Sequence, residues 1–177
     1  MLKVSYIGFN EYLARIKAAP ANLQKLVDDE MEAAAQDFEM GAKNLIRSHK
    51  GGGSGALLKS IHYEKKEVMK YNVSANLFYA PYYEFGTKRK VSITPGFEDV
   101  AASARGLPKR GNYKDMVKSL MIYLQRNGRP SKESDAKSMA YFIFKYGIMA
   151  RPFFFPNYTP VRNKLVSRIE NLLKSGI

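Results

Sequence analysis

The sequence predicts an α+β fold: a small antiparallel sheet packed by a long N-terminal helix and a C-terminal helix, with an inserted helical pair. Three observations predict it. Apolar residues step by four and three over about 21–48, alternating residues flank a turn near Lys70, and an amphipathic stripe ends the chain. Because 177 residues suit one domain of ordinary size, we expect a single domain over residues 1–177, with a helical insertion at 88–150.

The N-terminal part is expected to hold a strand and two helices. Residues 2–7 alternate like a strand, Asn10 can cap a brief helix to about residue 18, and Pro20 opens a long helix over about 21–48. The spacing of its apolar seam favours a core helix across a sheet, with a coiled coil as the alternative. Gly41 in this seam would let another backbone approach closely. The seam consists of Val27, Met31, Ala34, Phe38, Gly41 and Leu45.

A glycine run at 51–55 ends the long helix as a flexible loop. Residues 53–60 nearly fit a phosphate-binding loop, but Leu58 stands at the second glycine position. The order of elements is also wrong, because a phosphate loop runs from a strand into a helix. We therefore expect no nucleotide here.

A β-hairpin is expected next. Lys59 to Met69 is a polar, strand-like run, and after a turn near Lys70 the alternation continues to Tyr79. The polar first strand is expected at a sheet edge, guarded by Lys65 and Lys66. One face of the second strand is apolar: Tyr71, Val73, Ala75, Leu77 and Tyr79.

Three helices are expected in the second half, after an irregular basic stretch. Asn112 caps about 113–126, Ser131 caps about 132–146, and Gly147 ends the second helix, so the two can pack as an antiparallel pair. In the final helix Thr159 is the expected cap, followed by Pro160 at the first helical position. The apolar positions of the paired helices are Met116, Val117, Leu120, Met121 and Leu124, then Ala136, Met139, Ala140, Ile143 and Phe144.

Composition excludes several classes of function. There is no cysteine, and the only two histidines, His49 and His62, fall on different expected elements, so we expect no metal, no cofactor and no catalytic triad. No stretch approaches the roughly 18 apolar residues of a membrane helix, and the N-terminus lacks signal-peptide features. We expect synthesis in the cytoplasm and no membrane partner.

The formal net charge of +13 would attract nucleic acid, anionic lipid or an acidic protein surface, and it identifies no partner by itself. A basic protein that only needs solubility or matches acidic neighbours is the alternative to direct DNA contact. Basic loops would hold DNA without reading its sequence, or they would meet acidic protein surfaces. The candidate contacts are Lys88, Arg89, Lys90, Arg105, Lys109 and Arg110.

Two aromatic and proline segments are the candidate functional motifs. Glu84 lies among aromatic side chains, where we expect a structural carboxylate that accepts backbone hydrogen bonds or pairs with Arg151 or Arg89. Gly86 and Thr87 indicate a tight turn. The prolines at 152 and 156 should hold the phenylalanines between them extended; alternating side chains would then leave one for a neighbouring subunit to cover. The candidate interface or structural residues are Tyr79, Tyr82, Tyr83, Glu84, Phe85, Gly86, Thr87, Pro152, Phe153, Phe154, Phe155 and Pro156.

In this order, the strand, Glu84-Phe85-Gly86-Thr87, the Pro-Phe-Phe-Phe-Pro segment at 152–156 and the terminal helix resemble the head-tail connector, or neck and tail-completion, family of long-tailed bacteriophages. The resemblance also takes in the N-terminal strand, the long helix and residues 55–61. The stretch from about 88 to 150 departs from it, since many relatives shorten this part to a loop.

The resemblance implies a structural virion protein at the head-tail junction, assembled in the host cytoplasm, with no enzymatic activity. It implies a homo-oligomeric ring, six-fold favoured and twelve-fold as the alternative, that leaves a passage for DNA. Its other partners would be connector or head-closure proteins and tail-terminator or tail-tube proteins. A stand-alone basic nucleic-acid-binding protein is the alternative, and a hydrolase that uses Glu84 with another carboxylate is a third hypothesis.

Overall fold

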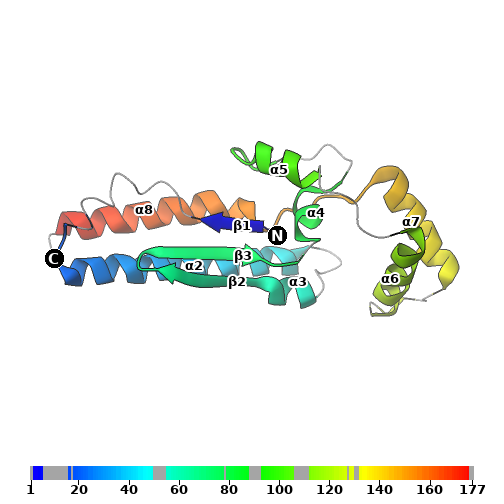
Figure 1. Ribbon diagram of the computed structural model, residues 1–177, viewed down its shortest axis with the longest axis horizontal. Helices are drawn as coiled ribbons and strands as arrows, with labels where there is room; N and C mark the ends of the chain where they lie inside the picture. The colour runs from blue at the N-terminus through cyan, green and yellow to red at the C-terminus, as the bar shows by residue number, and fades with distance from the viewer. Residues whose placement is uncertain are drawn as a thin grey trace. The chain divides into compact units, whose positions relative to one another are not determined.

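A computed structural model of the chain describes residues 2–5, 16, 18–49, 55–77, 79–87, 93–105, 112–126, 128–129 and 132–175. The chain divides into two compact units (Figure 1). The first unit comprises residues 1–84 and 151–177, and the second comprises residues 85–150. The predicted insertion at 88–150 nearly coincides with the second unit. That the whole chain folds as one domain stays a prediction.

The first unit contains an antiparallel three-stranded sheet in the order β1-β3-β2. Its strands are β1 (Leu2–Ser5), β2 (Ile61–Glu67) and β3 (Lys70–Ala75). Ala75 of the central strand lies opposite Leu2 on one side and Ile61 on the other. The predicted hairpin is confirmed. Residues 64–67 of β2 are exposed, as expected for a polar edge strand.

The predicted length of the second hairpin strand was wrong. β3 ends at Ala75, whereas the alternation was expected to continue to Tyr79, and a helix, α4 (Ala80–Phe85), follows. Tyr71 and Val73 are buried as predicted, but Asn72 on the opposite face is buried too. Alternation alone therefore did not locate the strand end or the solvent-facing side.

The long helix α2 (Ala21–Ser48) has the predicted bounds. It packs on β2, on β3 and along α8 (Tyr158–Ser175), and this confirms the core-helix interpretation (Figure 1). Its seam continues to Ala42 and Ile46 where Gly41 and Leu45 were predicted, because a straight helix has 3.6 residues per turn. The buried positions are Leu23, Val27, Met31, Ala34, Ala35, Phe38, Ala42 and Ile46.

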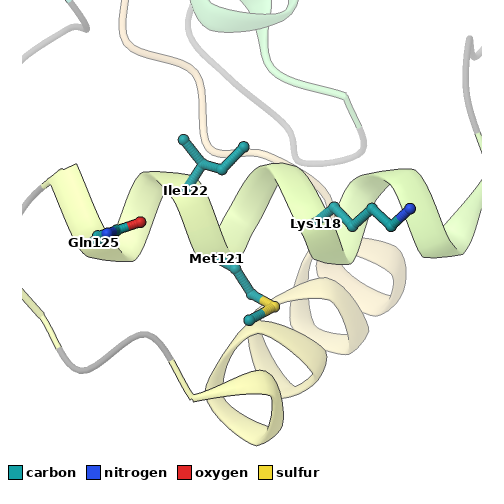
Figure 2. Close-up of a pocket in the computed structure, with 4 residues that line it drawn as sticks. All are labelled: Lys118, Met121, Ile122 and Gln125. Carbon is teal, nitrogen blue, oxygen red and sulfur yellow. The ribbon is translucent and has the colours of Figure 1, made fainter.

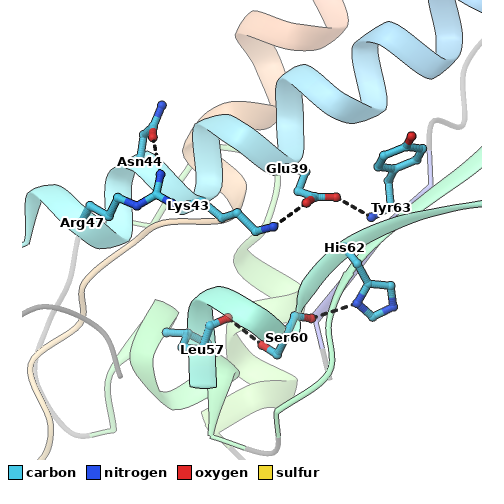
Figure 3. Close-up of polar contacts among 8 residues, drawn as sticks. All are labelled: Glu39, Lys43, Asn44, Arg47, Leu57, Ser60, His62 and Tyr63. Atoms are coloured by element: carbon cyan, nitrogen blue, oxygen red, sulfur yellow. Dashed lines mark hydrogen bonds and ion pairs between the residues drawn. The ribbon is translucent and has the colours of Figure 1, made fainter. Parts of the chain in front are cut away.

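Carboxylates on α2 fix the hairpin beside it. Asp28 accepts hydrogen bonds from the Met69 amide (2.8 Å) and the Tyr71 hydroxyl (3.2 Å), and it forms an ion pair with Lys65. Met69 holds φ +58° in the hairpin turn. Further along, Glu39 accepts the Tyr63 amide (2.8 Å) and pairs with Lys43 (Figure 3). The helix and the sheet edge are thus joined by polar contacts as well as by apolar packing.

Two helix starts in the first unit differ from the predictions. A short helix, α3 (Gly55–Ser60), precedes β2 where a loop and the first strand residues were expected. At the C-terminus the 3-10 turn η1 (Phe155–Asn157) runs directly into α8, so Thr159 is not the cap. Pro160 lies in the first turn of α8, where backbone amides lack intrahelical acceptors and proline is tolerated.

The second unit contains α5 (Glu98–Arg105), α6 (Tyr113–Arg126) and α7 (Glu133–Tyr146). The predicted α6 and α7 are confirmed and pack against each other, whereas α5 lies in a stretch predicted to be irregular. Asn112 caps α6 by accepting the Asp115 amide (2.9 Å). The shared core of the pair is Val117, Leu124, Ala136 and Ala140.

The ends of α7 were predicted in part. Lys132 occupies its N-cap position, where Ser131 was expected, and Ser131 lies outside the described residues. Gly147 ends the helix with φ +79°, as predicted. Phe144 is 70% exposed although it was predicted to pack.

Of the helices that the structure describes, none is long and apolar enough to cross a membrane. The brief helix expected to about residue 18 and the glycine loop at 51–54 lie outside the described residues, apart from Ile16 and residue 18.

Candidate structural and assembly site

Glu84 is a buried acid of the first unit. It lies on α4, and its side chain is 1% exposed. Pro81 is the second residue of this helix, where its missing amide costs nothing. The helix ends at Phe85, next to Gly86 with φ +66°, so the Tyr-Tyr-Glu-Phe segment is helical and does not extend the sheet.

The Glu84 carboxylate accepts three consecutive backbone hydrogen bonds. Oε2 accepts the amides of Phe153 (2.7 Å) and Phe154 (2.9 Å), and Oε1 accepts the amide of Phe155 (3.2 Å). Successive amides that converge on one anion form a backbone nest. Of the predicted roles, the structure shows the acceptor of backbone hydrogen bonds. This contact, which we call the Glu84 clamp, joins segments about seventy residues apart in the chain.

Burial raises the pKa of Glu84, and the three amide hydrogen bonds oppose that rise. A buried carboxylate with a raised pKa is typical of a general acid as well as of a structural group. Here both oxygens already accept backbone amides. Among the described residues, no group of three or more His, Asp or Glu side chains is placed to hold a metal ion.

The three phenylalanines are all buried within the chain itself. Phe153 and Phe154 are 0% exposed and Phe155 is 2% exposed. The prediction of an extended segment was wrong, because the backbone turns at Phe154 (φ −96°, ψ −65°) into η1. The turn breaks the alternation of side chains, so none of the three rings needs cover from a neighbouring subunit.

Edge-to-face contacts connect these rings to the rest of the core. Phe154 packs on Phe38 of α2 with ring centroids 5.0 Å apart, and on both of its sequence neighbours. Tyr83 packs on Phe153 at 5.7 Å. Such pairs contribute about 0.5–1.5 kcal/mol beyond the buried area. The Pro-Phe-Phe-Phe-Pro segment is therefore part of the core of the first unit.

A close contact between α2 and the 3-10 turn η1 lies beside this core. A Cβ on Gly41 would lie 2.5 Å from Asn157 Oδ1. The Asn157 amide is held in place, since its Nδ2 donates to the Phe153 carbonyl (2.7 Å). Gly41 was predicted to admit a close neighbour, and that neighbour is a side chain rather than a backbone.

Arg151 and Tyr83 form a second link in the same corner. The Arg151 amide donates to the Tyr83 carbonyl (2.7 Å), and the guanidinium lies 6.0 Å from the centre of the Tyr83 ring. The Tyr83 ring also lies 6.1 Å from the ring of His49. Burial lowers the pKa of His49, and the charge of Arg151 lowers it further. Arg151 thus stacks on a ring and does not pair with Glu84.

Gly86 and Thr87 join the first and the last residues of the second unit. A Cβ on Gly86 would lie 2.7 Å from the Ile148 carbonyl oxygen and 2.9 Å from the Ala150 amide nitrogen. Thr87 donates its amide to the Ile148 carbonyl (3.2 Å), and its hydroxyl accepts the Ile148 amide (2.8 Å). The predicted turn is confirmed, and its partners lie about sixty residues along the chain.

The predicted interface residues therefore separate into two groups. Glu84, Phe85 and the three phenylalanines are at most 3% exposed in a single chain, which fits the structural role. Gly86 is buried too. The other predicted residues are half-buried: Tyr79, Tyr82, Tyr83, Thr87, Pro152 and Pro156. Of the predicted basic contacts, Arg105 ends α5, and Lys88, Arg89, Lys90, Lys109 and Arg110 lie outside the described residues.

Sequence reasoning missed an exposed apolar surface on the second unit. Tyr141, Phe142, Phe144 and Tyr146 of α7 are 41–70% exposed, as is Met149 after it. On α6, Met121 points toward α7, whereas Ile122 points away beside a shallow hollow that Lys118 and Gln125 also line (Figure 2). The signal was available: residues 139–146 carry apolar side chains around the whole helix, whereas a helix covered on one side needs only a stripe.

The comparisons with known proteins bear on the first unit. Residues 10–86 match the family model described as "Bacteriophage HK97-gp10, putative tail-component". The comparisons with curated proteins and with solved structures give no significant match. The matched range includes α2, the hairpin and Glu84, and it ends at Gly86. The predicted resemblance to a tail-component family of phages is thus confirmed over this range, and it supports a structural, tail-related role.

Proposed function

We propose that this chain is a structural subunit of a phage particle that forms a ring at the head-tail junction and completes the tail. The observation that carries the proposal is the match over residues 10–86, a range that includes Glu84, the acceptor of the Glu84 clamp. Within the matched region, the buried Glu84 carboxylate is placed to hold α4 and residues 153–155 together. A ring of identical subunits needs a heterologous contact that closes on itself, and such a contact buries about 1,000 Å² or more.

The absence of enzymatic activity is part of the same proposal. A catalytic acid must present a proton or a lone pair to a substrate, whereas both oxygens of Glu84 accept backbone amides. The side chain is also closed off from solvent. We propose that burial and hydrogen bonding serve here to fix the fold of a building block.

A phage that lacks the gene tests the role in assembly. Electron microscopy should find filled heads and separate tails, and purified protein should restore joined, infectious particles. Normal infectious particles without the protein would refute the proposal. The purified chain should also form closed rings, alone or on isolated tails, in negative-stain images.

A stand-alone DNA-binding protein is the second candidate, and the net charge of +13 favours it. For such a protein the logarithm of the affinity for duplex DNA should fall steeply with the logarithm of salt concentration. As a ring subunit around a passage, the chain should hold DNA only weakly as a monomer. Tight binding by the monomer, together with normal particles in its absence, would favour this alternative.

A further inference from the structure

The exposed apolar surface on the second unit is best explained as a docking site. We define the aromatic face as Tyr141, Phe142, Phe144, Tyr146 and Met149. Their exposed fractions are 62%, 51%, 70%, 41% and 59%. Two of the aromatic rings already pack together, since the ring centroids of Phe142 and Tyr146 are 4.7 Å apart.

The sequence of α7 explains why one helix partner cannot cover it. Ala136 and Ala140 are 0% exposed and face the core shared with α6. Residues 139–146 read Met-Ala-Tyr-Phe-Ile-Phe-Lys-Tyr, so large apolar side chains occupy the other sides of the same two turns. A helix that is apolar all round is normally buried on every side. Small alanines face α6, and Phe144, one turn after Ala140 on the same side, is still 70% exposed. Tyr141, Phe142 and Tyr146 project from the other sides of the helix.

The area of the aromatic face suits a protein interface. At about 200 Å² for a full aromatic side chain, the exposed part is on the order of 500 Å². A stable interface takes about 800 Å² from each partner. The aromatic face therefore supplies more than half of the area that one partner contributes to a stable interface. It is also as large as the apolar patches that mark binding sites on monomers.

Charge identifies the kind of partner. Residues 85–150 contain thirteen Lys and Arg against five Asp and Glu, so they carry +8 of the chain's +13. One of these cations, Lys145, lies within the aromatic face, 5.8 Å from the ring centre of Tyr141 and 5.2 Å from that of Tyr146. A partner with carboxylates around an apolar centre would complement both features.

A second copy of the chain fits less well. Two faces from equally charged units would repel each other. The six carboxylates of α2 are also poor partners for Lys145 of a second copy. Four of them are in ion pairs within the chain, and Glu32 accepts the Tyr63 hydroxyl. Duplex DNA also fits less well, since its bases are already stacked and Met149 has no attraction for phosphate.

We infer that the aromatic face docks on an acidic protein surface with an apolar centre, carried by a different component of the particle. The inference rests on the proposed function, because it assigns this contact to the neighbour of the ring. It gives the second unit a role of its own, separate from the contacts that would close the ring.

Photo-crosslinking in assembled particles tests the inference. Phe144 is replaced by p-benzoylphenylalanine, and Met40, which is 57% exposed on α2, serves as the matched control position. Illumination should join position 144 to a different virion protein, at a segment with an excess of Asp and Glu. A product with a second copy of the chain, a product with DNA, or no product above the level of position 40 would overturn it.

Two substitutions separate this inference from the proposed function. Phe144→Ser and Lys145→Glu should each lower the titre of a phage complemented by the variant at least tenfold, whereas Met40→Ser should change it less than twofold. Thermal melting checks that each variant folds. If the gene is dispensable, the proposed function fails. If the gene is required and both variants complement fully, only the docking inference fails.

Discussion

Oε2 of Glu84 lies 2.7 Å from the backbone nitrogen of Phe153, and the same carboxylate accepts the next two amides as well. This relationship joins the end of the range that matches the tail-component family to a segment outside that range. The carboxylate is the acceptor for three buried donors, and it also orders the turn that buries three phenylalanines.

Glu84→Gln should lower the free energy of unfolding by about 2–4 kcal/mol, because the side-chain amide would turn a donor toward backbone amides that need an acceptor. Urea denaturation of the purified protein measures the loss. Glu67→Gln is the matched control, since that side chain is 69% exposed and forms a surface ion pair with Lys70; it should cost less than about 0.5 kcal/mol. Equal small effects at the two positions would show that the clamp contributes little.

The clamp should respond to pH in a defined direction. The pKa of Glu84 is raised in the folded protein, so the folded state binds its proton more tightly than the unfolded state does. Stability from this group is therefore largest below the usual glutamate value and falls as pH rises through the folded pKa. The stability difference between wild type and Glu84→Gln should be larger near pH 4 than at pH 7. A carbon NMR titration that places the Glu84 pKa at or below 4.5 would contradict this.

Asp28 should show the opposite dependence. Burial works against its ionisation, but hydrogen bonds from Lys65, Met69 and Tyr71 and the charge of Lys65 outweigh burial and lower its pKa. Its contribution is complete above the usual value of 3.8 and is lost as pH falls toward the lower folded pKa. Asp28→Asn should cost about 1–2 kcal/mol at pH 7 and less at pH 3, measured by urea denaturation. A penalty that grows on acidification would contradict the hydrogen bonding described for this turn.

Gly41→Ala should destabilise the protein by about 1 kcal/mol, although alanine favours helices, because its Cβ would meet the fixed Asn157 side chain. In an Asn157→Ala background the clash is gone, and the same substitution should stabilise by up to about 1 kcal/mol. The change of sign in this double-mutant cycle is the diagnostic result. The same sign in both backgrounds would mean that the two helices can move apart.

Gly86→Ala should destabilise the second unit by about 2–4 kcal/mol, since its Cβ would collide with the backbone at 148 and 150 in addition to the strain of positive φ. Gly96→Ala is the matched control, because Gly96 also has positive φ, but a Cβ added there would meet no atom of the described residues within 4 Å. It should cost only about 1 kcal/mol. Hydrogen exchange of α6 and α7 reports the difference, and equal protection in the two variants would contradict it.

The elements that sequence predicted well are those whose own periodicity is strong. The bounds of α2 and α6 were correct because each has a long apolar stripe and a clear start at Pro20 or Asn112. The edge position of β2 followed from the polar character of the first hairpin strand. Local pattern and tertiary packing agree in these elements.

The errors lie where tertiary contacts override local pattern. The alternation predicted a strand to Tyr79, but the strand ends at Ala75 and the helix that follows brings Glu84 to the amides at 153–155. The prolines at 152 and 156 predicted an extended segment, yet that same carboxylate stabilises a turn. No spacing along the chain indicates a contact across about seventy residues. The aromatic neighbours of Glu84 allowed its role as a hydrogen-bond acceptor to be proposed from the sequence. They did not indicate that the donors are the amides at 153–155.

A cryo-electron-microscopy reconstruction of the head-tail junction in purified particles tests the central proposal most directly. We predict a closed ring of identical copies around a passage wide enough for duplex DNA, with the Glu84 clamp inside each subunit and the aromatic face on a different protein. A reconstruction in which the junction contains no copy of the chain, or in which single copies touch no other copy, would contradict it.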